Sequence, residues 1–325
     1  MLLKTIHKML LKLPPETAHR VAAWGLGHFK GTVPRQALPK GPGLILGKGR
    51  SSFKLSHRVG LAAGFDKNAE MFGGLSRFGF GFIEVGTVTP LPQPGNPKPR
   101  LFRVKPQSLI NHMGFNNCGL AVFRQNIRRQ KSRVQLPLLA NIGKGRHTPE
   151  NEALEDYRKG FQFLEKDVDG FVVNLSSPNT PGLVKLQSVA FLEGIEENAP
   201  KDLPLFVKFS PDLDDSVLTE LCAWLKESKV FTGVVLTNTS RTLAESHYQA
   251  PVGGLSGPPI HERSIRCVEL ARQSIGGEKV VIGVGGIQSL KDAQDFRRAG
   301  ADAVEIYTGF VYRGAELMSE LSRLD

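Results

Sequence analysis

The sequence is poor in cysteine and in long apolar runs, and each shortage excludes a class of protein. Its 325 residues include only three cysteines, Cys118, Cys222 and Cys267, which are odd in number and far apart. This spacing predicts neither a disulfide framework nor a zinc or iron–sulfur site, and we expect no metal. Because no run of eighteen apolar residues occurs, we expect no segment to cross a bilayer.

Acidic residues are absent from the segment 85–149, although this segment carries eleven Lys and Arg within a chain of net charge +11. Such an imbalance attracts anions, which include a carboxylate substrate, a flavin phosphate, lipid head groups and nucleic acid. Composition does not choose among them. Arg124, Arg128 and Arg129 share one predicted helix here, and we interpret them as a contact with anionic lipid.

The first thirty residues have two apolar stripes at helical spacing. In the first, apolar residues fall on one helical face and Lys4, Lys8 and Lys12 on the other, which predicts a basic amphipathic helix. Pro14 then interrupts the chain, and a second helix is expected from Pro15 until Gly31. The pair either lies in a membrane interface or packs on the main domain, and the pattern leaves both open. We therefore predict an N-terminal extension, 1–31, and a main domain, 32–325.

Beyond residue 50, short apolar runs alternate with longer helical patterns, and eight such pairs occur. The runs predict strands near 57–63, 81–88, 136–142, 169–176, 204–210, 232–238, 279–285 and 302–307. The helical patterns predict helices near 66–78, 118–133, 150–166, 186–198, 214–228, 259–276, 289–299 and 312–324. Eight strand–helix units in this length predict an α/β fold, a (β/α)₈ TIM barrel.

A doubly wound sheet is the competing fold, but no GxGxxG motif follows the first predicted strand. Polar residues and glycines follow each predicted strand, and in a barrel these positions converge at one mouth. The long polar segment 90–117 is expected to be a loop of that mouth. Asn174 to Gly182 leaves another strand end; such Asn- and Ser-rich composition is also typical of a turn that only caps a strand.

Ten motifs resemble, in the same order, those of the dihydroorotate dehydrogenases, and together they cover most of the chain. They are GLAAGFDKNAE (60–70), EVGTVTPLPQPGNPKPRLFR (84–103), LINHMGFNN (109–117), NIGK (141–144), NLSSPNTPGL (174–183), VKFSPDL (207–213), TNT (237–239), GGLSGPP (253–259), IGVGGI (282–287) and IYTGF (306–310). The N-terminal extension resembles that of the quinone-dependent class. The resemblance implies oxidation of (S)-dihydroorotate to orotate in pyrimidine biosynthesis, with FMN as cofactor and a membrane quinone as electron acceptor.

The same resemblance makes Ser177 the base that removes the C5 proton of the substrate. A serine hydroxyl with its usual pKa is a poor base, so it needs a proton acceptor or a water chain, and Thr180 is a candidate relay. The substrate is a carboxylate with an amide-rich ring, which suits one cation and several amides. The implied substrate residues are Lys67, Asn111, His112, Met113, Gly114, Phe115, Asn174, Asn179, Asn238 and Thr239.

FMN is expected to lie along the mouth, with its phosphate on backbone groups after the seventh and eighth strands. Lys208 matches the lysine that faces the flavin ring, where a fixed cation stabilises the reduced form. The implied FMN residues are Ala63, Gly64, Phe65, Asp66, Lys67, Thr87, Asn141, Asn174, Lys208, Thr237, Gly257, Gly286, Tyr307 and Thr308.

The quinone is expected to reach the flavin through a tunnel beneath the N-terminal helices, where His19 and Arg103 match residues of the family. Both are also typical of ordinary surface charges. We expect a monomer that binds the anionic cytoplasmic side of the cell membrane peripherally and does not bind nucleic acid. Two alternatives remain: a related FMN barrel acting on RNA uracils, and a non-catalytic scaffold on the membrane surface. Val184, His112 and Pro258 depart from the common family residues, which puts secondary contacts in doubt.

Overall fold

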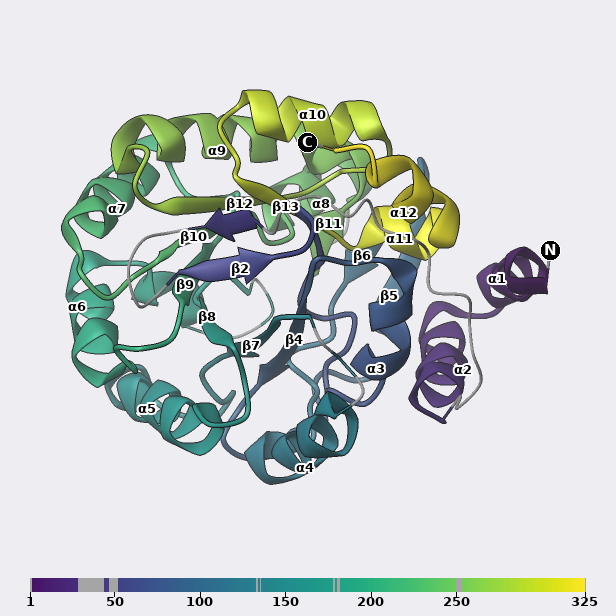
Figure 1. The fold of residues 1–325 in the computed structure, drawn as a ribbon, viewed down its shortest axis with the longest axis horizontal. Coiled ribbons are helices and arrows are strands. Elements are labelled where there is room, and N and C mark those ends of the chain that lie inside the picture. The colour runs from purple at the N-terminus through teal and green to yellow at the C-terminus, as the bar shows by residue number, and fades with distance from the viewer. Residues whose placement is uncertain are drawn as a thin grey trace.

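A computed structural model describes residues 2–28, 44–46, 52–132, 134, 136–177, 179, 182–249 and 253–324. Parallel strands form a closed barrel with the order β10-β12-β13-β3-β4-β7-β8-β9 around the ring (Figure 1). Their bounds are β3 Val59–Leu61, β4 Phe82–Val88, β7 Leu138–Ile142, β8 Gly170–Asn174, β9 Leu205–Phe209, β10 Gly233–Leu236, β12 Val280–Val284 and β13 Ala303–Ile306. Each lies within a predicted strand, and the predicted TIM barrel is confirmed.

Helices surround the barrel on its outside (Figure 1). They are α3 Phe72–Leu75, α4 Gly119–Lys131, α5 Ala153–Leu164, α6 Val189–Asn198, α7 Asp215–Glu227, α9 His261–Ile275, α10 Leu290–Arg298, α11 Thr308–Arg313 and α12 Ala315–Leu321. Short 3₁₀ turns accompany them: η2 Ser76–Phe78, η3 Glu150–Glu152, η4 Leu183–Leu186 and η5 Pro258–Ile260. The first helix begins later than the predicted residue 66, because the Asp66 carboxylate accepts the backbone N–H groups of Glu70 and Met71 and fixes a turn there.

Three features escaped the sequence interpretation. The predicted mouth loop 90–117 contains β5 Leu101–Val104 and β6 Ser108–Asn111, which form an antiparallel sheet with β11 Gly254–Ser256. Helix α8 Arg241–Tyr248 covers this sheet, where Ala244 packs with Ile110 and Leu255. Strands β1 Leu44–Leu46 and β2 Phe53–Leu55 pair as an antiparallel hairpin.

That hairpin lies over the lower end of the barrel, where the strands begin. The Phe53 ring meets the rings of Phe82 and Phe206, with centroids 5.5 and 6.0 Å apart. The inward side chains of this layer are apolar and buried; they are Phe82, Leu139, Val172, Phe206, Val235, Ile282 and Ala303. Apolar side chains therefore fill the barrel below the mouth, as expected of this fold.

The N-terminal segment forms α1 Leu2–Lys12 and α2 Pro15–His28, which lie beside the barrel near α11, α12 and β5 (Figure 1). Lys4 pairs with Glu316 at 2.5 Å, and the His7 ring contacts the carbonyl of Val311 at 2.9 Å. The predicted helix end at Gly31, like the boundary between 1–31 and 32–325, lies outside the described residues. No helix among the described residues has the length and hydropathy to traverse a membrane.

Candidate active site

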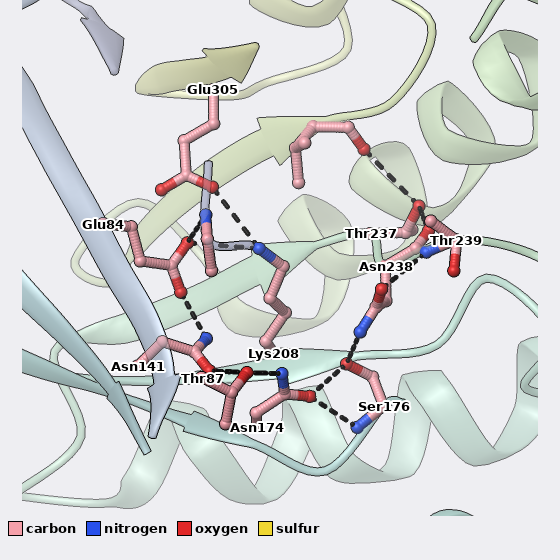
Figure 2. A network of polar contacts seen from close by, with 12 residues as sticks. Glu84, Thr87, Asn141, Asn174, Ser176, Lys208, Thr237, Asn238, Thr239 and Glu305 are labelled. Carbon is pink, nitrogen blue, oxygen red and sulfur yellow. Dashed lines mark hydrogen bonds and ion pairs between the residues drawn. The ribbon is translucent and has the colours of Figure 1, made fainter. Parts of the chain in front are cut away.

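A polar layer lies directly above the apolar layer of the barrel, because alternate residues of a strand point to the same side. Two positions after Phe82, Leu139, Val172 and Phe206 come Glu84, Asn141, Asn174 and Lys208; Thr237 and Glu305 follow Val235 and Ala303 in the same way. All six side chains are buried, and Figure 2 shows them converging inside the ring. A hydrophobic core is thus replaced at this level by a polar network.

The charged part of that network is one lysine between two carboxylates. The ammonium Nζ of Lys208 lies 3.1 Å from Glu84 Oε2 and 3.5 Å from Glu305 Oε2 (Figure 2). Burial lowers the pKa of Lys208, but the two carboxylates more than offset it and leave the pKa above its usual value. Burial and the negative charge of Glu84 raise the pKa of Glu305 well above its usual value.

Amides and hydroxyls extend this network across the barrel. Asn141 donates from Nδ2 to Glu84 Oε1 at 2.5 Å, and its Oδ1 accepts from the Thr87 hydroxyl at 2.5 Å. Asn174 donates to Thr87 Oγ1 at 2.9 Å and accepts from the Ser176 hydroxyl at 3.0 Å. Because each group is held by the next, the side chains that face the mouth are fixed before any ligand arrives.

Two adjoining cavities open above this layer, and Lys208 belongs to the wall of both. The first, of about 720 Å³, has among its lining eight residues that the family resemblance assigns to FMN: Ala63, Gly64, Lys208, Thr237, Gly257, Gly286, Tyr307 and Thr308. Apolar side chains from outside the predicted set also line it: Leu101, Leu109, Ile260, Val284, Ile287 and Ile306.

The second cavity, of about 470 Å³, contains nearly all of the implied substrate residues. Its lining includes Lys67, Asn111, Met113, Gly114, Phe115, Asn174, Ser177, Asn179, Asn238 and Thr239, together with Thr87. Four implied residues line neither cavity: Phe65, Asp66, Asn141 and His112. Asn141 acts through Thr87 and Glu84, and His112 contacts Asn179 Oδ1 with its Nδ1 at 3.1 Å.

Ser177 lies just after β8, buried in the wall of the second cavity. Its Oγ accepts the backbone N–H of Asn179 at 3.3 Å, and the Asn179 amide donates to the carbonyl of Asn111 at 2.8 Å. The loop after β8 is therefore tied to the sheet above the mouth. Thr180, the candidate relay, lies outside the described residues, as does the side chain of Val184.

Lys67 faces Ser177's cavity from the turn after β3. The buried Asp66 fixes this turn, and burial raises the pKa of its carboxyl to about 6. Burial and the nearby Arg100 lower the pKa of Lys67 to about 8. The turn therefore presents an ammonium that is charged at neutral pH and close to losing its proton.

His19 and Arg103 both connect the N-terminal helices to the mouth. His19 Nε2 contacts the carbonyl of Phe65 at 2.7 Å, and Arg103 donates to the carbonyl of Leu13 at 2.5 Å. The Phe65 ring packs in turn against Tyr307, with centroids 5.4 Å apart. Burial lowers the pKa of His19, which favours the neutral ring. A chain of contacts thus leads from α2 to the first cavity.

Two of the three arginines interpreted as a lipid contact are paired within the chain. Arg124 and Arg128 on α4 each contact the carboxylate of Asp167 at 2.7 Å. Their charges are thereby partly neutralised, which weakens the expectation that they bind anionic lipid.

Comparison with known proteins identifies the family. The family model described as dihydroorotate dehydrogenase matches residues 51–323. The chain belongs to the dihydroorotate dehydrogenase family. "Dihydroorotate dehydrogenase (quinone)" of Marinobacter nauticus is 41% identical over 97% of this chain and 96% of its own, and that of Methylibium petroleiphilum is 42% identical over 97% and 95%. The resemblance inferred from the ten motifs is therefore confirmed.

Solved structures of dihydroorotate dehydrogenases agree with this assignment. DHODH from Eimeria tenella in complex with ferulenol is 35% identical, with a TM-score of 0.84 over 95% of this chain and 90% of that one. The ligand-free type from the same organism also has a TM-score of 0.84, with 36% identity. The similarity to these structures therefore extends over 95% of this chain.

Sequence reasoning missed Glu84 and Glu305, although both lie within this site. Each interrupts an otherwise apolar strand, in FIEVGTV and AVEI, at an inward position. A carboxylate in the middle of a barrel strand is a signal that could have found them, because charged residues are rarely buried without a partner.

Proposed function

We propose that this protein catalyses the oxidation of (S)-dihydroorotate to orotate in pyrimidine biosynthesis, with FMN as its resident cofactor and a membrane quinone as the final electron acceptor. The observation that carries this proposal is the pair of adjoining cavities with Lys208 in their common wall, one cavity lined by Ser177 and Lys67. A cofactor in the first cavity and a small carboxylate in the second would lie side by side.

The first cavity fits FMN in shape and in chemistry. Its far end is formed by glycine backbone: a Cβ on Gly286 would approach His261 Cβ to 2.7 Å, and one on Gly257 would approach Ser108 Oγ to 2.6 Å. Both glycines have positive φ, +71° and +108°, so other residues would be strained there. Bare backbone suits a phosphate, whereas Leu101, Leu109 and Val284 provide apolar surface for a flat ring. When bound, FMN supplies the hydride acceptor and the electron carrier to quinone.

Lys208 and its carboxylate partners would lie beneath the ring. A fixed ammonium would stabilise negative charge on the ring above it. The ion pair with Glu84 holds the Lys208 side chain in one position. The amide chain from Asn141 to Asn174 keeps the same surface rigid.

In the second cavity, we propose that the Lys67 ammonium binds the substrate carboxylate and that Asn111, Asn174, Asn179 and Asn238 recognise the ring amides. Amides both donate and accept, which matches a ring with alternating N–H and C=O groups. Ser177 Oγ would then receive the C5 proton. Its burial excludes bulk water as the acceptor, so the proton must leave along an ordered path.

The N-terminal helices would bring this site to a membrane. Ile6, Met9, Val21 and Trp24 are large apolar side chains exposed on α1 and α2, a pattern typical of helices that lie in the interface. We propose peripheral binding of a monomer to the cytoplasmic, anionic side of the cell membrane, with quinone approaching along His19, Arg103 and Phe65. The family relationship leaves the RNA-uracil and scaffold alternatives without a supporting observation.

The test is an absorbance spectrum of the purified protein before and after anaerobic addition of dihydroorotate. We expect a yellow protein that releases FMN on denaturation, loses its flavin absorbance with the substrate, and recovers it when a quinone is added. A colourless protein that cannot be loaded with FMN, or a spectrum that dihydroorotate leaves unchanged, would contradict the proposal.

A further inference from the structure

The charge balance of the polar layer is unusual, because two buried carboxylates share a single cation. Glu84 and Glu305 are both fully buried, and Lys208 is the cation that contacts each of them among the described residues. If both carboxylates were ionised, a net negative charge would remain in the barrel interior, away from water. Burying an uncompensated charge is strongly unfavourable.

The two carboxylates are not equivalent. Glu84 accepts hydrogen bonds from Asn141 Nδ2 at 2.5 Å, from Lys208 Nζ at 3.1 Å and from the backbone N–H of Ala63 at 3.2 Å. Neither carboxyl oxygen of Glu305 has a hydrogen-bond partner, although both oxygens are buried and Lys208 lies 3.5 Å away. Glu84 thus has three hydrogen-bond donors, whereas Glu305 has only the more distant Lys208 ammonium to favour its charged form.

We infer that Glu84 and Glu305 hold one proton between them, carried mainly by Glu305, so that the cluster with Lys208 is electrically neutral. A protonated Glu305 has one O–H group that can be donated to the Glu84 carboxylate, which gives a partner to one of its two buried oxygens. The raised pKa of Glu305, which is caused by burial and by the negative charge of Glu84, agrees with this distribution. Two carboxyl groups that share one site and one proton titrate as a pair.

This proton sets the charge that faces the first cavity, since Lys208 and Glu305 both line it. The charged groups that face Glu305 are Glu84 on β4 and Lys208 on β9. The residues at this level of the neighbouring strands are Ala62, just after β3, and Val284 on β12, and neither can titrate. The effect on FMN rests on the proposed function, whereas the shared proton itself does not.

Infrared spectroscopy of the protein without FMN tests the shared proton directly. At pH 8 we expect a carboxylic acid C=O band that is lost both in Glu305→Gln and in Glu84→Gln, because either variant leaves one carboxylate that pairs with Lys208. Within the described part of the chain, Asp66 is the other buried carboxyl whose pKa is raised, to about 6, and it is ionised at this pH. Absence of the band from the wild-type protein would overturn the inference, and so would its persistence in either variant.

The redox potential of bound FMN provides a second measurement, because it depends on the charge of the cluster and not only on the stability of the fold. With one shared proton, Glu305→Gln exchanges one neutral group for another and should leave the potential at the wild-type value. The double variant Glu84→Gln/Glu305→Gln leaves Lys208 unpaired and should raise it, which shows that the measurement is sensitive to this charge. If the single variant raised the potential instead, both carboxylates would be ionised in the wild-type protein and the inference would be wrong.

The two measurements separate this inference from the proposed function. A protein that failed to bind FMN would contradict the proposed cofactor, but the infrared band would still decide whether the proton is shared.

Discussion

The N-terminal helices and the barrel mouth depart from ordinary protein surfaces and interiors in opposite directions. On α1 and α2, Met9 and Trp24 are 63% and 70% exposed, although both are large apolar side chains. In the barrel, Glu84, Lys208 and Glu305 are almost completely buried, although all three are ionisable. One region therefore exposes what proteins usually bury, and the other buries what they usually expose.

This difference indicates that each region is suited to bind a partner that is not part of the chain. Polar contacts hold the inner side of the helices to the barrel, through the pairs Lys4–Glu316 and Glu16–Arg100. Their large apolar side chains are thus left exposed. At the mouth, polar side chains line two cavities instead of lying on the outer surface. The proposed membrane surface would account for the first arrangement, and the proposed cofactor with its substrate would account for the second.

The largest expected effect belongs to the mouth. Replacing Ser177 by Ala removes the proposed base, and general base catalysis typically contributes about 10²–10⁴-fold to the rate. We expect a loss of this size in kcat for dihydroorotate, with FMN still bound. Ser246→Ala, on the exposed face of α8, is the control and should behave as wild type. A Ser177→Ala protein with an unchanged rate near neutral pH would refute the assignment.

Lys208→Met tests whether the buried charges need their cation. Removing one partner from a buried ion cluster typically costs about 3–5 kcal/mol in the free energy of unfolding, because the remaining charge has no compensation. Urea unfolding of the protein without FMN measures this loss. Lys201→Met, at an exposed position, should leave stability nearly unchanged. Equal stability of the two variants would mean that the cluster contributes nothing.

Vesicle binding should be sensitive to negative charge added on the exposed apolar face of α1 and α2. In the double variant Met9→Glu/Trp24→Glu we expect vesicle binding to weaken by about tenfold or more, because burying one large apolar side chain is worth about 1.5–3 kcal/mol. Quinone reduction should fall with it, while a soluble dye still accepts electrons. As a control, Phe163→Glu on α5 introduces one such charge at an exposed apolar residue of the barrel. Equal losses in both proteins would remove the special role of α1 and α2.

The pH dependence of substrate capture sharpens the electrostatic side of the comparison. As the pH rises through about 8, Lys67 loses its proton and with it the charge that binds a carboxylate. We therefore expect kcat/KM to fall above this pH, mainly through a higher KM. Lys67→Arg keeps its charge and should not show the fall, even if its activity is lower. A wild-type profile that stays flat through this range would exclude Lys67 as the anion-binding group.

The smallest effect is expected on α4. Because Arg128 is already paired with Asp167, Arg128→Glu should leave cosedimentation with anionic vesicles unchanged within error. A loss comparable to that of the α1–α2 variant would restore the second lipid contact that the sequence suggested.

Periodicity was sufficient to predict the barrel, because each strand and its following helix are local patterns. Every barrel strand lies where an apolar run predicted it, from Val59–Leu61 to Ala303–Ile306. The sheet of β5, β6 and β11 could not be found in this way. Its strands are three or four residues long, and β11 pairs with β6 across more than 140 residues of sequence. Short strands with distant partners leave no local period.

The site was reached by a different route. Lys67, Ser177 and Lys208 came from motifs, and the structure places them around two adjoining cavities; their roles stay predictions. Motifs could not supply the pairing of Lys208 with Glu84 and Glu305, because it depends on three strands whose inward positions meet only after the ring closes.

The β1–β2 hairpin limits the routes by which ligands can reach the site. Because Phe53 packs against Phe82 and Phe206, the described residues leave no entrance at the end of the barrel opposite the mouth. The substrate must therefore enter, the product must leave and the electron acceptor must approach through the same open end of the barrel. In the proposed function, the two reactants must therefore bind one after the other or use separate entrances around this rim, one of them beside α1 and α2.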